Sequence, residues 1–160
     1  MKPWLDDSDD PRCYFAYGSN MSSRRLLARI PAASALGRAR CSGYRVVCNK
    51  PSLDGSGKAN LVESPAAAVW GVVYRVARED WLELDRYEPG YTRHLCRVGL
   101  DDGSIVRAGV YLWLGEPTVE AAWDWYRDHL LHGAREHGLP HGAIEQIRSW
   151  ATRRDPKRSR

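Results

Sequence analysis

The sequence contains no apolar run of about 18 residues, the length that a helix needs to cross a membrane. Its first eleven residues include four aspartates and lack the apolar stretch of a secretory signal. We therefore expect a cytoplasmic protein with no membrane partner. At 160 residues the chain is long enough to bury a substantial core as one domain.

Paired cysteines are also missing. The four cysteines are Cys13, Cys41, Cys48 and Cys96. They include no Cys-x-x-Cys pair, and three of them lie within or beside apolar segments. This placement is typical of free, buried thiols in a reducing compartment. A disulfide has no positive support and stays an open alternative.

The sequence lacks a recognisable metal site. It has five histidines, which are His94, His129, His132, His137 and His141. His129 and His132 could share a helix face, but Gly138 and Pro140 interrupt any helix that continues to His141. No Asp or Glu completes a ligand set, so we expect no metal and no cofactor.

Motifs for nucleotides and for serine hydrolases are incomplete. Gly57-Lys58 matches part of a phosphate-binding loop, but Ser52 stands where the first glycine is required. Ala59 replaces the Ser or Thr that would bind the metal. Ser19 lacks the elbow motif of a nucleophilic serine.

The net charge of +4 is concentrated at one end of the chain. Residues 1–12 carry −2 and residues 153–160 carry +4, which leaves +2 for the rest. We expect an acidic N-terminal extension (1–12), one domain (13–150) and a basic, disordered tail (151–160). Such a tail could contact nucleic acid, but the nearly neutral domain disfavours this function, and we expect no nucleic-acid partner.

Periodicity predicts an α+β fold. Strands are expected over 39–49 (bulged at Gly43), 59–63, 69–76, 91–100 and 104–114, and helices over 24–30, 79–85, 117–137 and 143–150. The segment 69–76 is apolar on both faces, as in a strand that is covered on both sides. We predict a small mixed sheet that curls into a β-barrel and is flanked by short helices.

Tyr14-Phe15-Ala16-Tyr17-Gly18-Ser19-Asn20-Met21 begins as an apolar strand and breaks into a turn. A helix follows, with Ser22 or Ser23 as its N-cap. A strand that ends in a glycine turn facing a helix start presents free backbone N–H groups, which suit a carboxylate or a phosphate. A tight turn without a ligand is the open alternative.

Glu88 follows a predicted helix and lies between two tyrosines, Tyr87 and Tyr91. Apolar surroundings raise the pKa of a carboxyl group toward neutrality, as a general base or acid requires. A solvated loop glutamate is the alternative.

Together these stretches resemble the γ-glutamylcyclotransferase-like (AIG2-like) family. Tyr14–Met21 resembles its opening signature, and Leu84-Asp85-Arg86-Tyr87-Glu88 resembles the second signature, whose glutamate is the acid/base catalyst. Val69–Tyr74 looks like the family's central strand, and 133–140 is similar to a segment of the γ-glutamylcyclotransferase branch. The likeness spans residues 13–150. One difference is that Pro89-Gly90 makes the gap between Glu88 and Tyr91 shorter than in some members of the family.

The resemblance implies a metal-independent cyclotransferase, of lyase or acyltransferase type, that releases 5-oxoproline from a γ-glutamyl amine or amino acid. The α-amine would attack the γ-carbonyl, with Glu88 as general base and then acid. The substrate-binding residues would be Tyr14, Phe15, Ala16, Tyr17, Gly18, Ser19, Asn20 and Tyr111.

Three points stay open. The chain could be a non-catalytic relative that binds a small ligand in the same pocket. The leaving amine could be an amino acid, a lysine isopeptide, glutathione or an antibiotic precursor. Trp125 lies on the opposite helix face from Trp123 and is a candidate dimer contact, so a homodimer is also open.

Overall fold

The computed structural model describes residues 1–5 and 7–158. Its elements are β1 (Lys2–Pro3), η1 (Asp7–Asp9), β2 (Cys13–Ala16), η2 (Ser19–Met21), α1 (Ser23–Arg29), β3 (Ser34–Pro51), β4 (Gly57–Arg75), α2 (Asp80–Tyr87), β5 (Thr92–Leu100), β6 (Ile105–Leu112), β7 (Ala122–Trp123), α3 (Asp124–Glu136), α4 (His141–Arg148) and β8 (Thr152–Arg153). None of these helices is long and apolar enough to cross a membrane.

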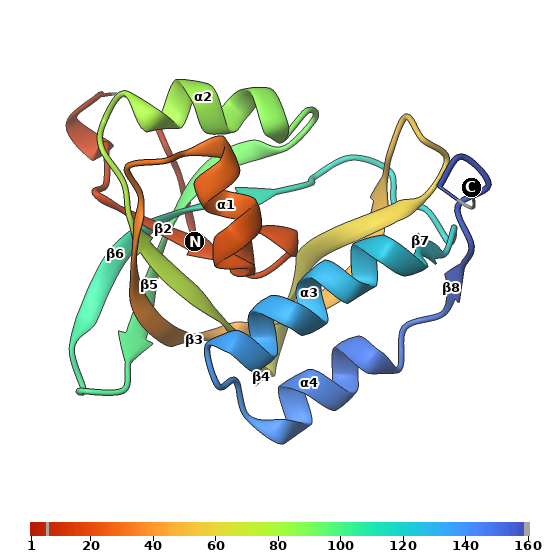
Figure 1. Cartoon of the computed structure of the whole chain (residues 1–160). Coiled ribbons are helices and arrows are strands. Elements are labelled where there is room, and N and C mark those ends of the chain that lie inside the picture. The colour runs from red at the N-terminus through yellow and green to blue at the C-terminus, as the bar shows by residue number, and fades with distance from the viewer. Residues whose placement is uncertain (6, 159–160) are drawn as a thin grey trace.

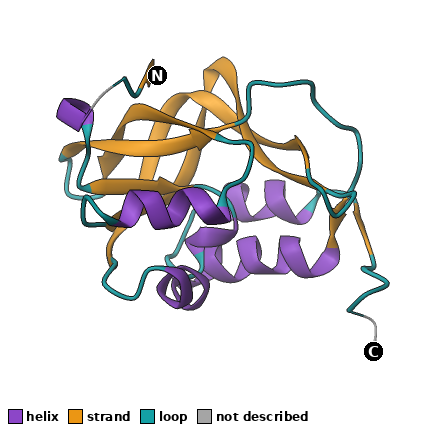
Figure 2. Cartoon of the chain, turned by 90° about the horizontal axis from the view of Figure 1, so that it is seen from above, coloured by secondary structure: helices purple, strands orange, loops and turns teal. Residues whose placement is uncertain are grey.

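The main sheet closes into a five-stranded barrel. Its strand order is β1-β5-β3-β4-β2-β6, and β6 also pairs with β5 to complete the ring, with β1 added outside it (Figure 1). β2 and β6 run parallel, while the other pairs in this sheet are antiparallel. The α-helices gather along one side of the strands (Figure 2). The predicted α+β fold with a mixed barrel is therefore confirmed.

The doubly apolar segment lies in the middle of the barrel wall, as expected. Val72 and Val73 are completely buried, and β4 pairs with both β2 and β3. A Cβ added to Gly71 would lie 2.4 Å from the Ala16 carbonyl oxygen and 2.6 Å from the Phe15 ring. Glycine at this position lets β2, which carries the opening motif, lie directly against β4.

The long hairpin β3–β4 differs from the prediction at one place. The expected bulge at Gly43 (φ +86°) is present, because the register shifts between Ser42 and Tyr44. The predicted end of a strand before Ser64-Pro65 is wrong, since β4 continues through both residues. The register places this stretch opposite the bulge, where a proline without an N–H is tolerated.

Helix α3 begins later than predicted. Instead of a helix from Pro117, the chain is extended up to Trp123, and Val119 is fully exposed. Backbone hydrogen bonds hold this stretch against the β3–β4 hairpin: Thr118 N–H donates to the Asn49 carbonyl and Gly57 N–H to the Ala121 carbonyl. These bonds outweigh the local helical periodicity. The C-terminal glycine stop is confirmed at Gly138, where φ is +65°.

Within the described residues, both ends of the chain pair with other strands. Lys2–Pro3 pair with β5, so part of the expected extension is a strand of the sheet. The expectation of a disordered tail does not fit residues 151–158: β8 pairs with β7, and Asp155 is buried. Specific partners, which a charge count cannot reveal, order this segment. Asp6 and residues 159–160 of the two predicted segments lie outside the described residues.

All four cysteines are free in the structure, but the expected burial is found for only two of them. Cys41 and Cys96 are buried, and Cys13 and Cys48 are partly exposed.

Candidate active site

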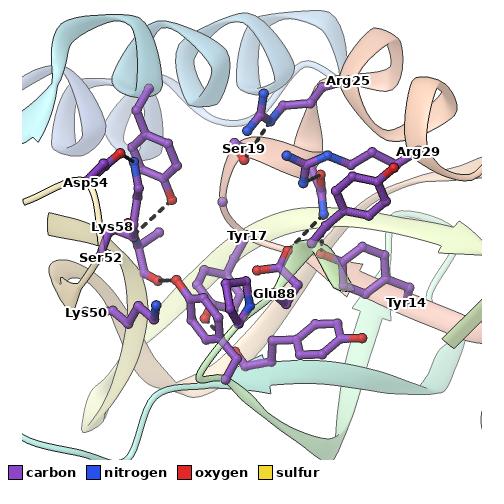
Figure 3. Close-up of a pocket in the computed structure, with 18 of the residues that line it drawn as sticks. Tyr14, Tyr17, Ser19, Arg25, Arg29, Lys50, Ser52, Asp54, Lys58 and Glu88 are labelled. Atoms are coloured by element: carbon purple, nitrogen blue, oxygen red, sulfur yellow. Dashed lines mark hydrogen bonds and ion pairs between the residues drawn. The ribbon is translucent and has the colours of Figure 1, made fainter. Parts of the chain in front are cut away.

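A cavity of about 240 Å³ opens where the turn after β2 meets the end of α2, the tip of the β3–β4 hairpin and the start of α3 (Figure 3). Its lining includes seven of the predicted site residues: Tyr14, Tyr17, Gly18, Ser19, Asn20, Glu88 and Tyr111. The two family-like motifs, about seventy positions apart in the sequence, therefore face the same space.

The structure does not place Phe15 and Ala16 in this lining, although the resemblance implied that both bind substrate. Side chains alternate along a strand, so Phe15 points away from Tyr14 and packs beside Gly71. Ala16 is buried opposite Val72 of β4, and its side chain is a single methyl group. Both residues support the strand and do not form the cavity wall.

Glu88 enters the cavity because the chain turns at the end of α2. It is the C-cap of the helix, and its N–H donates to the Asp85 carbonyl. Gly90 then adopts a positive φ of +84°, which glycine tolerates, and the next strand begins. The Glu88 carboxylate points toward the turn that follows β2 (Figure 3).

Asn20 connects this carboxylate to the opening motif. Its amide nitrogen donates to Glu88 Oε1 and to the Tyr14 hydroxyl, each over 3.1 Å. Its amide oxygen accepts a 3.0 Å hydrogen bond from Arg29 Nη1. Because Asn20 is buried and both ends of its amide are engaged, its orientation and that of the Glu88 carboxylate are fixed together.

Burial raises the pKa of Glu88 to about 7, and the nearby Asp85 carboxylate acts in the same direction. The cationic side chains of Arg29, Arg25 and Lys50 oppose this shift but do not cancel it. A carboxyl group with this pKa accepts and returns protons readily near neutral pH.

The turn after β2 also supplies backbone hydrogen-bond donors among the residues that line the cavity. Ser19 and Asn20 begin η2, and in the described part of the chain neither of their N–H groups has a hydrogen-bond partner. Gly18 brings the backbone close to the opposite wall, since a Cβ there would lie 3.4 Å from Ala59 Cβ. Arg25 Nε donates to Ser19 Oγ over 3.0 Å and fixes the turn.

Tyr111 forms part of the cavity wall. Its hydroxyl donates to Asp85 Oδ1 over 2.8 Å, and its carbonyl accepts a 2.5 Å hydrogen bond from the Tyr17 hydroxyl. The two tyrosines thus brace the cavity.

Four cationic residues in the lining were missed by the sequence analysis: Arg25, Arg29, Lys50 and Lys58. Arg25 and Arg29 are four residues apart on α1 and share a face, a spacing that could have been recognised. Lys50 and Lys58 are direct partners in the β3–β4 register, which the sequence does not reveal. Like charges placed opposite each other destabilise a sheet, and their presence favours a site for an anion.

The two lysines differ in their partners. Lys58 Nζ lies 3.1 Å from Asp54 Oδ2, and hydrogen bonds from Ser56 and Lys58 outweigh burial and lower the pKa of Asp54. Lys50 Nζ lies 4.9 Å from the centre of the Tyr91 ring, and burial lowers its pKa.

Trp125, the candidate dimer contact, lines the cavity, contacts Asp155 and Arg158 of its own chain, and stays partly exposed. Among the described residues no group of three or more His, Cys, Asp or Glu side chains could hold a metal ion. Burial lowers the pKa of His129 to about 4, so that this histidine is neutral at pH 7.

Comparison with known proteins agrees with this arrangement. A family model described as gamma-glutamyl cyclotransferase, AIG2-like, matches residues 14–127. Gamma-glutamylcyclotransferase of Bos taurus is 29% identical over 136 residues, covering 79% of this chain and 72% of that protein. The Homo sapiens protein of the same name is 27% identical over 145 residues, covering 85% and 77%.

Solved structures agree as well. One named gamma-glutamyl cyclotransferase has a TM-score of 0.81 and 25% identity, covering 88% of each chain. An uncharacterized Homo sapiens protein has a TM-score of 0.81 and 26% identity, covering 90% of each. The barrel, the order of the two motifs and the family match lead to one conclusion: this chain belongs to the gamma-glutamyl cyclotransferase, AIG2-like family.

Proposed function

We propose that this protein is a γ-glutamylcyclotransferase that converts a γ-glutamyl amide into 5-oxoproline and a free amine. The relatives that carry this name support a cyclotransferase activity in general. The observation that carries the proposal for this chain is the position of Glu88, whose pKa is about 7, in the lining of a small cavity that also includes Ser19 and Asn20. Within the described residues, the backbone N–H groups of Ser19 and Asn20 have no hydrogen-bond partner.

In the proposed reaction, the α-amine of the substrate attacks its own γ-carbonyl carbon. A C–N bond forms to close the five-membered lactam, and the C–N bond to the leaving amine breaks. Because both reacting groups belong to one molecule, the protein mainly holds the bent conformer, and such orientation is worth about 7–11 kcal/mol.

Glu88 would carry the proton between the two nitrogens. The α-ammonium of a substrate has a pKa near about 8, so a carboxylate whose own pKa is about 7 can take its proton without a large mismatch. The protonated Glu88 then gives this proton to the departing nitrogen. The restored carboxylate takes the second proton that the attacking nitrogen loses as the lactam N–H forms, and passes it to the released amine, which leaves as an ammonium. Asn20 keeps the carboxylate in place during these transfers.

The cationic lining suits the charge of the substrate. Arg29 is oriented by Asn20, and Lys50 is buried in the wall, so each could pair with the α-carboxylate. The N–H groups of the turn would receive either this carboxylate or the carbonyl oxygen as negative charge develops on it.

The test is incubation of the purified protein with a panel of γ-glutamyl amino acids, γ-glutamyl-lysine isopeptide and glutathione, with 5-oxoproline as the readout. We expect Glu88→Gln to lower kcat by about 10²–10⁴, the range of a lost general acid–base catalyst. Glu83→Gln, on the exposed side of α2, is the matched control and should leave kcat unchanged.

Turnover by a folded Glu88→Gln variant would contradict the role of Glu88. If the wild-type protein binds 5-oxoproline but turns over none of the compounds, the alternative of a non-catalytic binding protein is favoured.

A further inference from the structure

The C-terminal segment 152–158 holds one wall of the cavity. The Trp125 indole N–H donates to Asp155 Oδ2 over 2.8 Å. The Arg158 guanidinium lies 3.9 Å from the centre of the same ring, and Lys58 Nζ lies 4.8 Å from it. Trp125 is therefore fixed between Lys58 of β4 and the C-terminal segment.

The same segment also reaches the tip of the β3–β4 hairpin (Figure 1). Arg153 donates to the Gly55 carbonyl, pairs with Glu120 over 3.4 Å and stacks on the Trp123 ring at 4.3 Å. The hairpin tip carries Asp54, which lines the cavity. Two separate parts of the lining thus depend on contacts with residues 152–158.

A groove between α1 and α3 adjoins the cavity at Trp125. The cavity and the groove share Arg25, Arg29 and Trp125 in their linings. Five arginines line the groove, namely Arg24, Arg25, Arg29, Arg135 and Arg158, against two acidic residues, Asp128 and Glu136. Glu136 Oε1 already accepts a hydrogen bond from the backbone N–H of Ser23.

The excess of positive charge has an effect that is visible within the groove. Burial and then the charges of Arg25, Arg158 and Arg29 lower the pKa of His129. A neutral histidine adds no further charge, and the potential of the groove comes from the arginines. An anionic group that leaves the cavity past Trp125 would meet Arg158 and Arg25.

We infer that residues 152–158 are a specificity-determining part of this active site. They hold Trp125 as the wall beside the leaving group and place Arg158 where it favours a leaving amine that carries a carboxylate. The inference rests on the proposed function, because it assumes that the γ-glutamyl part lies between Glu88 and the turn. The leaving amine then extends toward Trp125 and the groove.

Two substrates of nearly equal size test this inference. In γ-glutamyl-alanine the leaving amine carries a carboxylate, and in γ-glutamyl-isopropylamine a methyl group replaces it. The measured quantity is the ratio of kcat/KM for the first compound to kcat/KM for the second. A variant that is merely less well folded loses kcat/KM for both compounds alike, so the ratio does not change.

The variant is Arg158→Gln, and the matched control is Arg154→Gln. Arg154 is exposed in the same segment and belongs to the lining of neither the cavity nor the groove. We expect Arg158→Gln to lower the ratio about fivefold, as for a partly exposed charge pair. Arg154→Gln should keep the wild-type ratio. Equal effects of the two variants, or no effect of either, would overturn the inference.

Binding separates this inference from the proposed chemistry. In a Glu88→Gln background, which should not turn over, the two compounds are titrated calorimetrically with and without Arg158→Gln. A fall in the preference for γ-glutamyl-alanine supports the specificity role even if the wild-type protein releases no 5-oxoproline. Turnover by the wild type together with an unchanged preference refutes the specificity role and leaves the proposed function intact.

Discussion

At Glu88, three cationic side chains compete with burial for control of one proton. Arg29, Arg25 and Lys50 all favour the carboxylate, yet the pKa is still raised from 4.5 to about 7. Arg29 reaches Glu88 through the Asn20 amide, which accepts from the arginine and donates to the carboxylate. The carboxyl group therefore stays basic enough for proton transfer although it lies among positive charges.

This pKa predicts a pH-dependent cost in stability. A group whose pKa is higher in the folded than in the unfolded state stabilises the fold below its unfolded pKa of about 4.5, and loses this contribution as the pH rises through about 7. Glu88→Gln cannot ionise. We expect its free energy of unfolding to rise relative to wild type by about 2 kcal/mol between pH 5 and pH 8.

Urea denaturation of both proteins at the two pH values measures this difference. Glu79→Gln is the control, because it removes an exposed carboxylate just before the same helix. If wild type and Glu88→Gln keep a constant difference across this range, the raised pKa is wrong.

The sequence predicts some residues of the site and misses others. Glu88 and the residues of the turn after β2 were predicted because each belongs to a continuous motif, whose residues are neighbours in the sequence. Lys50 and Lys58 do not, because they meet only through the pairing of two long strands. Phe15 lies inside the motif, but its side chain faces away from the cavity. The prediction failed here because a motif does not specify which face of a strand lines the cavity.

Among the helices, α3 supports the site through a glycine contact. A Cβ on Gly133 would lie 2.4 Å from the Met21 carbonyl carbon and 2.4 Å from the Ser22 nitrogen. Both atoms are backbone and cannot swing away. The bare surface of α3 at Gly133 therefore allows η2, which carries Ser19 and Asn20, to pack at its observed position.

Gly133→Ala and Gly142→Ala should have opposite effects. Alanine is the better helix former by about 1 kcal/mol, but at position 133 the clash should reverse this gain and destabilise the protein by about 1–2 kcal/mol. A Cβ on Gly142 in α4 meets open space. Gly142→Ala should therefore stabilise the protein by about 0.5 kcal/mol. Thermal unfolding of both variants is the measurement, and stabilisation by both would exclude close packing of α3 on η2.

Periodicity predicted most elements but failed where distant partners decide the conformation. The stretch from Pro117 to Trp123 has helical spacing, yet hydrogen bonds to the β3–β4 hairpin keep it extended. β4 runs through Pro65 because the bulge in β3 accommodates it. Neither partner is adjacent in the sequence, so local patterns could not reveal them.

The two ends of the chain support different residues of the cavity lining. The C-terminal segment holds Trp125. The N-terminal segment places Trp4 edge-on against Trp81 at 4.8 Å, and the Trp81 ring contacts Tyr14 at 5.8 Å and Tyr111 at 6.2 Å. Trp4 is thus the outer end of an aromatic cluster whose inner members line the cavity.

Trp4→Ala should therefore destabilise the whole domain, although Trp4 lies outside the region of family likeness. The change removes two contacts of the Trp4 ring. One is its edge-on contact with Trp81, and the other is its contact with the Arg93 guanidinium, which lies 4.5 Å from the ring centre. We expect a loss of about 2 kcal/mol, less than for a fully buried tryptophan because Trp4 is partly exposed. Leu5→Ala is the control, since that side chain is 79% exposed. Urea unfolding followed by tryptophan fluorescence compares the two, and equal midpoints would mean that the first residues add nothing to the barrel.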